Sequence, residues 1–90
     1  MHAVVVRVAI SDFEKARESL QDEIIPRVSA APGFVAGYWL EPTDGKGLSV
    51  VVFENEDAAR GMLAMVQEGS SPSAFATVES SEVREVVGHA

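Results

Sequence analysis

Hydrophobic and polar positions along the chain follow two kinds of pattern, and each pattern predicts one type of element. Residues 3–10 are valine, alanine and isoleucine interrupted by one charge at Arg7, which is typical of a strand buried on both faces. Downstream, hydrophobic residues recur every three or four positions with charged residues between them, which predicts an amphipathic helix. These helix positions are Phe13, Ala16, Leu20 and Ile24.

The ends of this helix also carry local signals. Ser11 and Glu14 match the S-x-x-E capping box, in which each side chain accepts from the other residue's backbone N–H, so Ser11 is predicted as the cap. Pro26 lacks a backbone N–H, and its ring disfavours a straight continuation. We therefore expect a kink or a restart of the helix near Pro26.

Two strands and a hairpin are predicted in the middle of the chain. Residues 34–41 follow a Pro-Gly turn, contain the only Trp and the only Tyr, and stop at Pro42. Residues 42–47 are rich in Gly and Asp, and residues 48–53 again read as a strand. The pattern predicts an antiparallel pair.

The last third predicts a helix, a loop and a final strand. Asn55 is placed to cap a helix over residues 56–68, and residues 69–73 read as a loop. Residues 82–88 are the expected last strand, with a register that the sequence leaves open. The order strand, helix, strand, strand, helix, strand indicates a ferredoxin-like α+β fold: one domain over residues 1–90, with two helices on one face of a four-stranded antiparallel sheet.

The sheet face without helices is the basis of the functional prediction. Alternate strand residues point to opposite faces, and this parity assigns Val5, Val35, Trp39, Val51 and Phe53 to the uncovered face. Such an apolar patch marks an interface or a pocket, so we expect a homodimer whose sheets face each other around a cavity. The candidate ligand-binding residues are Arg7, Trp39, Glu41, Ser49, Phe53 and Arg84, with Glu85 as the alternative to Arg84 in the last strand.

Composition excludes several classes of protein. Fourteen acidic against seven basic residues give a net charge of −7, which argues against binding nucleic acid or an anionic membrane. The chain has no cysteine, and its two histidines show no metal-ligand spacing, so neither a metal nor another cofactor is expected. No run approaches the ~18 apolar residues of a membrane span, and a cytoplasmic protein is the default expectation.

Several segments together resemble a known group of proteins. Residues 31–37 (Ala-Pro-Gly-Phe-Val-Ala-Gly), residues 51–59 and residues 83–87 look like the dimeric α+β barrel superfamily, and within it the antibiotic biosynthesis monooxygenase-like (ABM) domains. The resemblance implies a homodimer with an internal pocket in each subunit. Group members include cofactor-independent oxygenases of polycyclic phenols, haem-degrading enzymes, isomerases of small lactones and proteins of no known activity. The Asn and His with which the haem-degrading members ligate iron have no counterpart here.

Three functions follow as hypotheses. The leading one is a homodimer that binds a small apolar or aromatic molecule, with cofactor-independent monooxygenation as its potential activity. The alternative is a non-catalytic dimerisation or ligand-sensing module, and the third is an isomerase using Glu41 or Glu85. Trp39 is interpreted either as interface core or as pocket lining. Arg7 either stabilises a substrate anion or pairs with Glu41, Glu85 or an acid of the partner.

Overall fold

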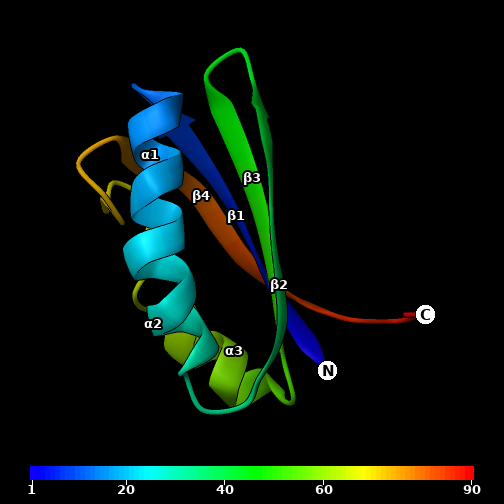
Figure 1. Ribbon diagram of the computed structural model, residues 1–90. Coiled ribbons are helices and arrows are strands. Elements are labelled where there is room, and N and C mark those ends of the chain that lie inside the picture. The colour runs from blue at the N-terminus through cyan, green and yellow to red at the C-terminus, as the bar shows by residue number, and fades with distance from the viewer.

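The computed structural model describes residues 1–90 as an antiparallel sheet with helices on one side (Figure 1). The strands, which lie side by side in the order β2-β3-β1-β4, are β1 (His2–Ile10), β2 (Phe34–Thr43), β3 (Lys46–Phe53) and β4 (Ala76–Glu85). The helical segments are α1 (Phe13–Ser19), η1 (Leu20–Ile24), α2 (Ile25–Ser29) and α3 (Glu56–Leu63). The predicted α+β class, the order of elements and the four-stranded antiparallel sheet are confirmed.

The first helix begins at a different cap from the predicted one. The Asp12 carboxylate accepts a hydrogen bond from the Lys15 backbone N–H at 3.1 Å, so Asp12 is the N-cap. The Ser11 backbone N–H donates instead to the Phe75 carbonyl at 3.0 Å. The prediction of Ser11 as cap was wrong because both residue types cap well, and the distant contact with Phe75 decides between them.

The helix passes Pro26 through a π-helical turn. In η1 the wider turn brings the Ile25 backbone N–H to the Leu20 carbonyl, five residues earlier, and α2 starts with Pro26 in its first turn. Pro26 has no backbone N–H to donate, and it stands where the π-helical turn gives way to α2. The predicted restart near Pro26 therefore takes the form of a π-helical turn, a feature often found at functional sites.

The β2-β3 hairpin is confirmed. Its turn is formed by Asp44 and Gly45, which both have positive φ angles of 54° and 74°. Two consecutive positive φ angles are the signature of a type I′ turn, whose twist matches that of the flanking strands. Because this turn needs only two residues, β2 continues to Thr43 and β3 begins at Lys46.

In the C-terminal third, the end of the helix and the start of the last strand both differ from the prediction. Asn55 caps α3 as expected, accepting from the Ala58 backbone N–H at 2.9 Å. The helix, however, ends at Leu63, and the Gly69 N–H donates to the Val78 carbonyl at 2.8 Å. This loop pairs with the start of β4, which runs over Ala76–Glu85. The predicted bounds of this strand, residues 82–88, were therefore too far toward the C-terminus.

The pairing of β1 with β3 decides which side chains form the core. Val4 lies opposite Val51 and Val6 lies opposite Ser49, so these side chains share one face, the face that the helices cover. Phe53 and Val51 are both 0% exposed. The buried core consists of Val4, Val6, Val51, Phe53, Ala59 and Val78.

This register corrects the predicted faces of β2 and β3. Trp39 lies opposite Ser49 and packs against the core, so Trp39, Val51 and Phe53 are on the helix side and not on the uncovered side. The parity of β1 was predicted correctly, but both faces of β3 are apolar. In such a strand, alternation alone cannot say which face turns to the core.

We predict that Phe53→Ala lowers the free energy of unfolding by about 3–5 kcal/mol, because it opens a cavity around a fully buried ring. Phe13→Ala is the matched control, since Phe13 is 47% exposed and loses much less buried area. Urea unfolding followed by circular dichroism measures both variants. Equal losses would contradict the assignment of Phe53 to the core.

Candidate ligand-binding cavity

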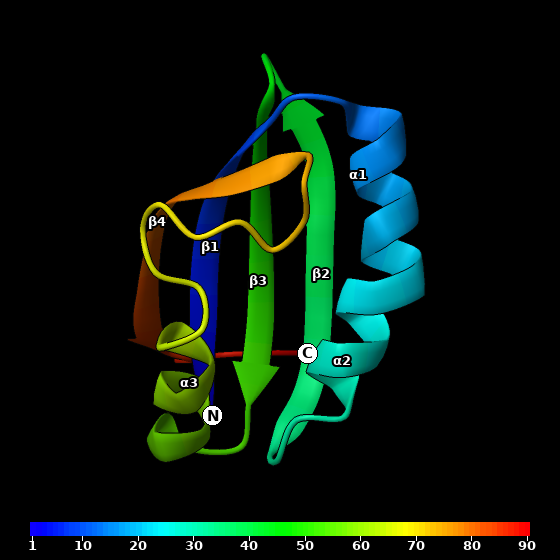
Figure 2. The same ribbon diagram turned by 90° about the vertical axis from the view of Figure 1, so that its left-hand side faces the viewer.

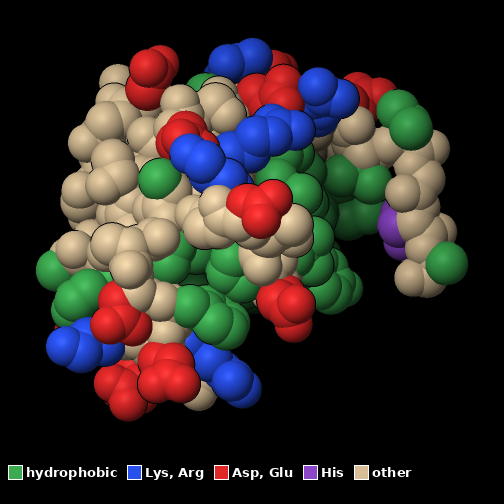
Figure 3. All heavy atoms as spheres, turned by 90° about the horizontal axis from the view of Figure 1, so that it is seen from above, with side chains coloured by type: hydrophobic (Ala, Val, Ile, Leu, Met, Phe, Trp, Pro, Cys, Tyr) green, Lys and Arg blue, Asp and Glu red, His purple; other side chains and the backbone are tan.

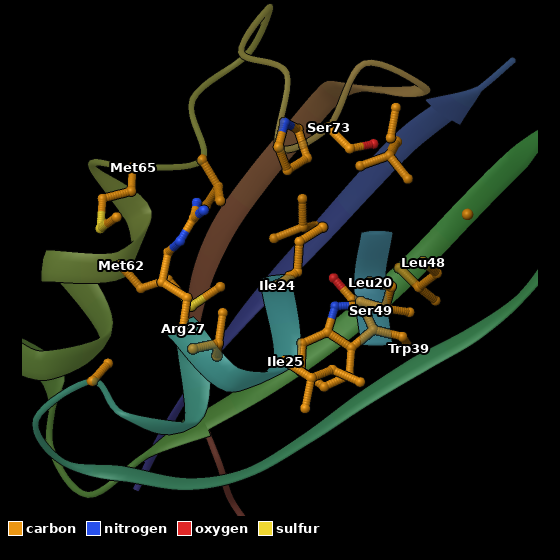
Figure 4. Close-up of a pocket in the computed structure, with 18 of the residues that line it drawn as sticks. Leu20, Ile24, Ile25, Arg27, Trp39, Leu48, Ser49, Met62, Met65 and Ser73 are labelled. Atoms are coloured by element: carbon orange, nitrogen blue, oxygen red, sulfur yellow. The ribbon is translucent and has the colours of Figure 1, made fainter. Parts of the chain in front are cut away.

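A cavity of about 1200 Å³ lies between the helices and the sheet. Strands β1, β2 and β3 form its floor, and the two helical regions stand at its sides (Figure 2). The chain that follows α3 contributes Pro72 and Ser73 at one end (Figure 4). Three separate parts of the chain therefore border the same space.

The lining of this cavity is mainly apolar. Of the 34 residues that line it, 19 are hydrophobic. The first helix supplies branched aliphatic side chains, and α3 and the turn that follows it each supply one methionine (Figure 4). The apolar residues of these segments that Figure 4 labels are Leu20, Ile24, Ile25, Met62 and Met65.

Trp39 is held over the backbone of its own strand. A Cβ atom placed on Gly37 would lie 2.7 Å from Trp39 Cη2, which is closer than real side-chain contacts allow. Only glycine at position 37 therefore permits this orientation of the indole ring. The role of Gly37 is not visible in the sequence, since a glycine within a strand is equally consistent with a bulge.

Ser49 lies next to Trp39 on the neighbouring strand. The two residues are directly opposite in the β2-β3 pairing, and Ser49 is 9% exposed. Figure 4 shows the Ser49 hydroxyl and the indole nitrogen of Trp39 directed toward the same part of the cavity. Neither group makes a hydrogen bond to another protein atom.

The predicted site residues separate onto the two faces of the sheet. Trp39, Glu41, Ser49 and Phe53 line the cavity on the helix side. Arg7 and Arg84 do not line it. They face the uncovered side of the sheet, where both contact Glu82.

The three charged residues on the uncovered face form one network. Arg7 Nη1 lies 3.5 Å from Glu82 Oε1, and Arg84 Nε lies 3.2 Å from Glu82 Oε2. The hydrogen bond from Arg84, with the contribution of Arg7, holds the pKa of the Glu82 carboxyl below its usual value. The predicted partners of Arg7, Glu41 and Glu85, are wrong, because the pairing of β1 with β4 places Glu82 opposite Val5, next to Arg7.

A row of apolar side chains also crosses the uncovered face. Tyr38, which is 61% exposed, lies opposite Val50, and Val50 lies opposite Val5. This row crosses three strands and ends at Glu82 on β4. Figure 3 looks onto the molecule from above, perpendicular to the view of Figure 1, and shows hydrophobic side chains near the middle of this view with charged side chains beside them.

Two cations of the cavity were missed by sequence reasoning. Arg17 and Arg27 lie on the first helix and both line the cavity. Figure 4 shows the Arg27 side chain extending from α2 toward the α3 side of the cavity. The sequence gives the positions of both arginines on the helix. It does not give the position of the helix over β2, which decides that these two side chains line the cavity.

Comparisons with known protein families, with curated proteins and with solved structures give no match to this chain. The structure also contains no group of three or more His, Cys, Asp or Glu side chains arranged to hold a metal ion. None of its helices combines the length and the hydrophobicity that crossing a membrane requires.

We predict that Glu82→Gln removes a pH-dependent part of the stability. The pKa of Glu82 is lowered in the folded protein, so its ion pairs stabilise above the ordinary glutamate pKa of 4.5, and this contribution is lost as pH falls through the lower folded value. The difference in unfolding free energy between wild type and Glu82→Gln should be constant above about pH 6 and shrink below about pH 4.

The matched control for this experiment is Glu18→Gln, at an exposed helix position without an ion-pair partner. Urea unfolding at several pH values measures both variants. If the difference in unfolding free energy between wild type and Glu82→Gln grew as the pH falls, the assigned ion pairs would be contradicted.

Proposed function

We propose that this protein is a homodimer that binds one small, largely apolar and aromatic molecule in the helix-side cavity of each subunit. The observation that carries the proposal is a cavity of about 1200 Å³ with a mainly apolar lining around the only tryptophan. Sites for small molecules measure roughly 300–1,000 Å³ and have this kind of lining with a few polar groups. The space is therefore sufficient for a ligand of several fused rings.

The size of the cavity also favours ligand binding over the alternative function. A purely structural dimerisation module would fill its interior with its own side chains and leave far less space. A sensing module remains compatible with the cavity, since sensing also begins with binding. The lactone isomerase is not favoured, because Glu41 lines the cavity whereas Glu85 lies on β4 next to His2, with its carboxylate 4.0 Å from His2 Nε2.

The proposed dimer uses the uncovered face of the sheet. Tyr38, Val50 and Val5 form an apolar row there, and an exposed apolar face of a small domain lowers its stability in water. A second copy with the same face would cover this row through a two-fold contact. Together with the ferredoxin-like order of the strands, this contact would produce the dimeric α+β barrel that the resemblance implies.

The chemistry implied by the resemblance requires a different cation from the predicted one. Cofactor-independent oxygenation needs a substrate anion that reduces O₂ directly, stabilised by a nearby positive charge. Arg7 is on the opposite face of the sheet from the cavity, whereas Arg17 and Arg27 line it. If the protein is an oxygenase, Arg17 or Arg27 is the residue to stabilise the anion.

We predict that Tyr38→Asp converts the dimer to a monomer, because it places a charge in the apolar row that the second copy would cover. Light scattering after size exclusion measures the mass. Ala64→Asp, at an exposed position on the helix side, is the control and should leave the dimer intact. A wild-type protein that is monomeric at all concentrations would contradict the proposed dimer.

We predict that anilinonaphthalene sulfonate, a fused-ring dye, binds in the cavity and accepts energy from Trp39, which is the only source of tryptophan emission. Val8→Phe should reduce this binding at least about tenfold, because it fills the floor of the cavity. Val35→Phe, at an exposed position of β2 outside the lining, should bind the dye like the wild type. Unchanged binding to Val8→Phe would place the dye elsewhere and contradict the proposal.

A further inference from the structure

We propose that Arg27 holds the carboxylate of a ligand whose apolar body fills the helix-side cavity. The ligand class is an organic acid with one carboxylate on an apolar skeleton. This inference rests on the proposed function, since it requires that the cavity binds a ligand. It adds the charged group that the ligand carries and the residue that recognises this group.

The first argument is the position of Arg27. Its side chain lines the cavity, and Figure 4 shows it extending from α2 to the α3 side, where Met62 and Met65 are labelled. Its guanidinium makes no hydrogen bond and no ion pair with another residue of the chain. Thioether sulfurs accept hydrogen bonds only weakly, so the methionines do not replace a partner. The N–H donors of Arg27 are therefore available to a ligand.

The second argument explains why Arg27 lacks the partner that the sequence offers. In a regular α-helix, Glu23 would lie beside Arg27 on the next turn, at the spacing that favours an ion pair. The π-helical turn η1 ends between the two residues, and its wider turn shifts the side chains that follow it around the helix axis. No ion pair between Glu23 and Arg27 is formed. Arg27 extends across the cavity instead, so the π-helical turn contributes to the proposed site.

The third argument is the desolvation of this cation. A ligand that fills the apolar space beside Met62 and Met65 removes water from the Arg27 guanidinium. A cation that loses its hydration destabilises the complex unless an anion pairs with it. A carboxylate is the best match, because its oxygens accept parallel hydrogen bonds from the planar guanidinium. A neutral ligand of the same shape would therefore bind less tightly.

The charges around the cavity favour a ligand with a single negative charge. Glu41, Glu54 and Asp57 also line the cavity, and none of them forms an ion pair. Glu41 lies near the hairpin end of β2, and the other two flank the start of α3, whereas Arg27 extends toward the end of α3 (Figure 4). With the net charge of −7, these carboxylates repel a dianion such as a phosphate monoester. A single carboxylate beside Arg27 is therefore favoured.

The experiment compares two probes, naphthoate and naphthamide, which have nearly the same shape and differ in charge. Isothermal titration calorimetry of the purified wild-type protein at neutral pH should give about tenfold tighter binding of naphthoate, because a hydrogen bond between charged groups contributes about this factor or more in affinity. The preference should become smaller at about 1 M salt, where charges are screened within about 3 Å. Without a cation as partner, the carboxylate would lose its hydration, and naphthoate would bind more weakly than naphthamide.

Two variants test the assignment of Arg27. Arg27→Gln removes the charge, so it should lose the preference for naphthoate, while the affinity for naphthamide stays within about twofold. Arg27→Lys keeps the charge but not the planar guanidinium, and it should retain part of the preference. Arg60→Gln is the matched control, since it removes the same charge from an exposed position of α3 that does not line the cavity. This control should retain the full preference.

The outcomes separate this inference from the proposed function. If the wild type binds both probes equally, or naphthamide more tightly, the carboxylate site is overturned and the binding cavity stands. If neither probe binds, both proposals are overturned. If the preference for naphthoate persists in Arg27→Gln, the assignment of Arg27 is wrong. Its loss in Arg17→Gln would then place the carboxylate at the other cation of the lining, roughly 15 Å away along the helix axis.

Discussion

The pairing of β1 with β3 is the constraint on which the rest of this structure depends. Val4 opposite Val51 and Val6 opposite Ser49 fix which side chains of the two central strands meet the helices. A shift of one residue would turn every side chain of β3 to the other face. Phe53 would then leave the core, and Ser49 and its neighbour Trp39 would no longer share the cavity.

This register gives the sheet two faces with different properties. On the helix side, a core of valines and Phe53 continues into a cavity whose polar groups are few. On the other side, the apolar row that contains Tyr38 ends at the network of Arg7, Glu82 and Arg84. The proposed ligand and the proposed second copy therefore occupy opposite faces and do not compete for the same residues.

Local signals of the sequence predicted most of the fold. The β2-β3 hairpin, the Asn55 cap and the order of the elements each depend on residues that are close together in the chain, and each is confirmed. The cap at Asp12 and the start of β4 were missed, because both depend on backbone contacts of Ser11 and Gly69 with residues near β4. Such long-range contacts leave no pattern within a short window.

The candidate site was predictable in its residues more than in its geometry. Trp39 and Ser49 were recognised as a large aromatic and a polar residue in apolar strands, which is a local property. Their face was wrong, since β3 is apolar on both sides and alternation cannot orient it. Arg17 and Arg27 were missed because the helix carries many charges, and only its position over β2 selects these two.

The most direct test of the central account, a ligand cavity on one face and self-association on the other, is native mass spectrometry of the purified protein. The account predicts a species of twice the 9.6 kDa chain mass, with a small, largely apolar and aromatic molecule bound once per subunit. A monomer that binds no such molecule would contradict it. A dimer that releases its ligand only on unfolding would support both the ligand cavity and the self-association through the opposite face.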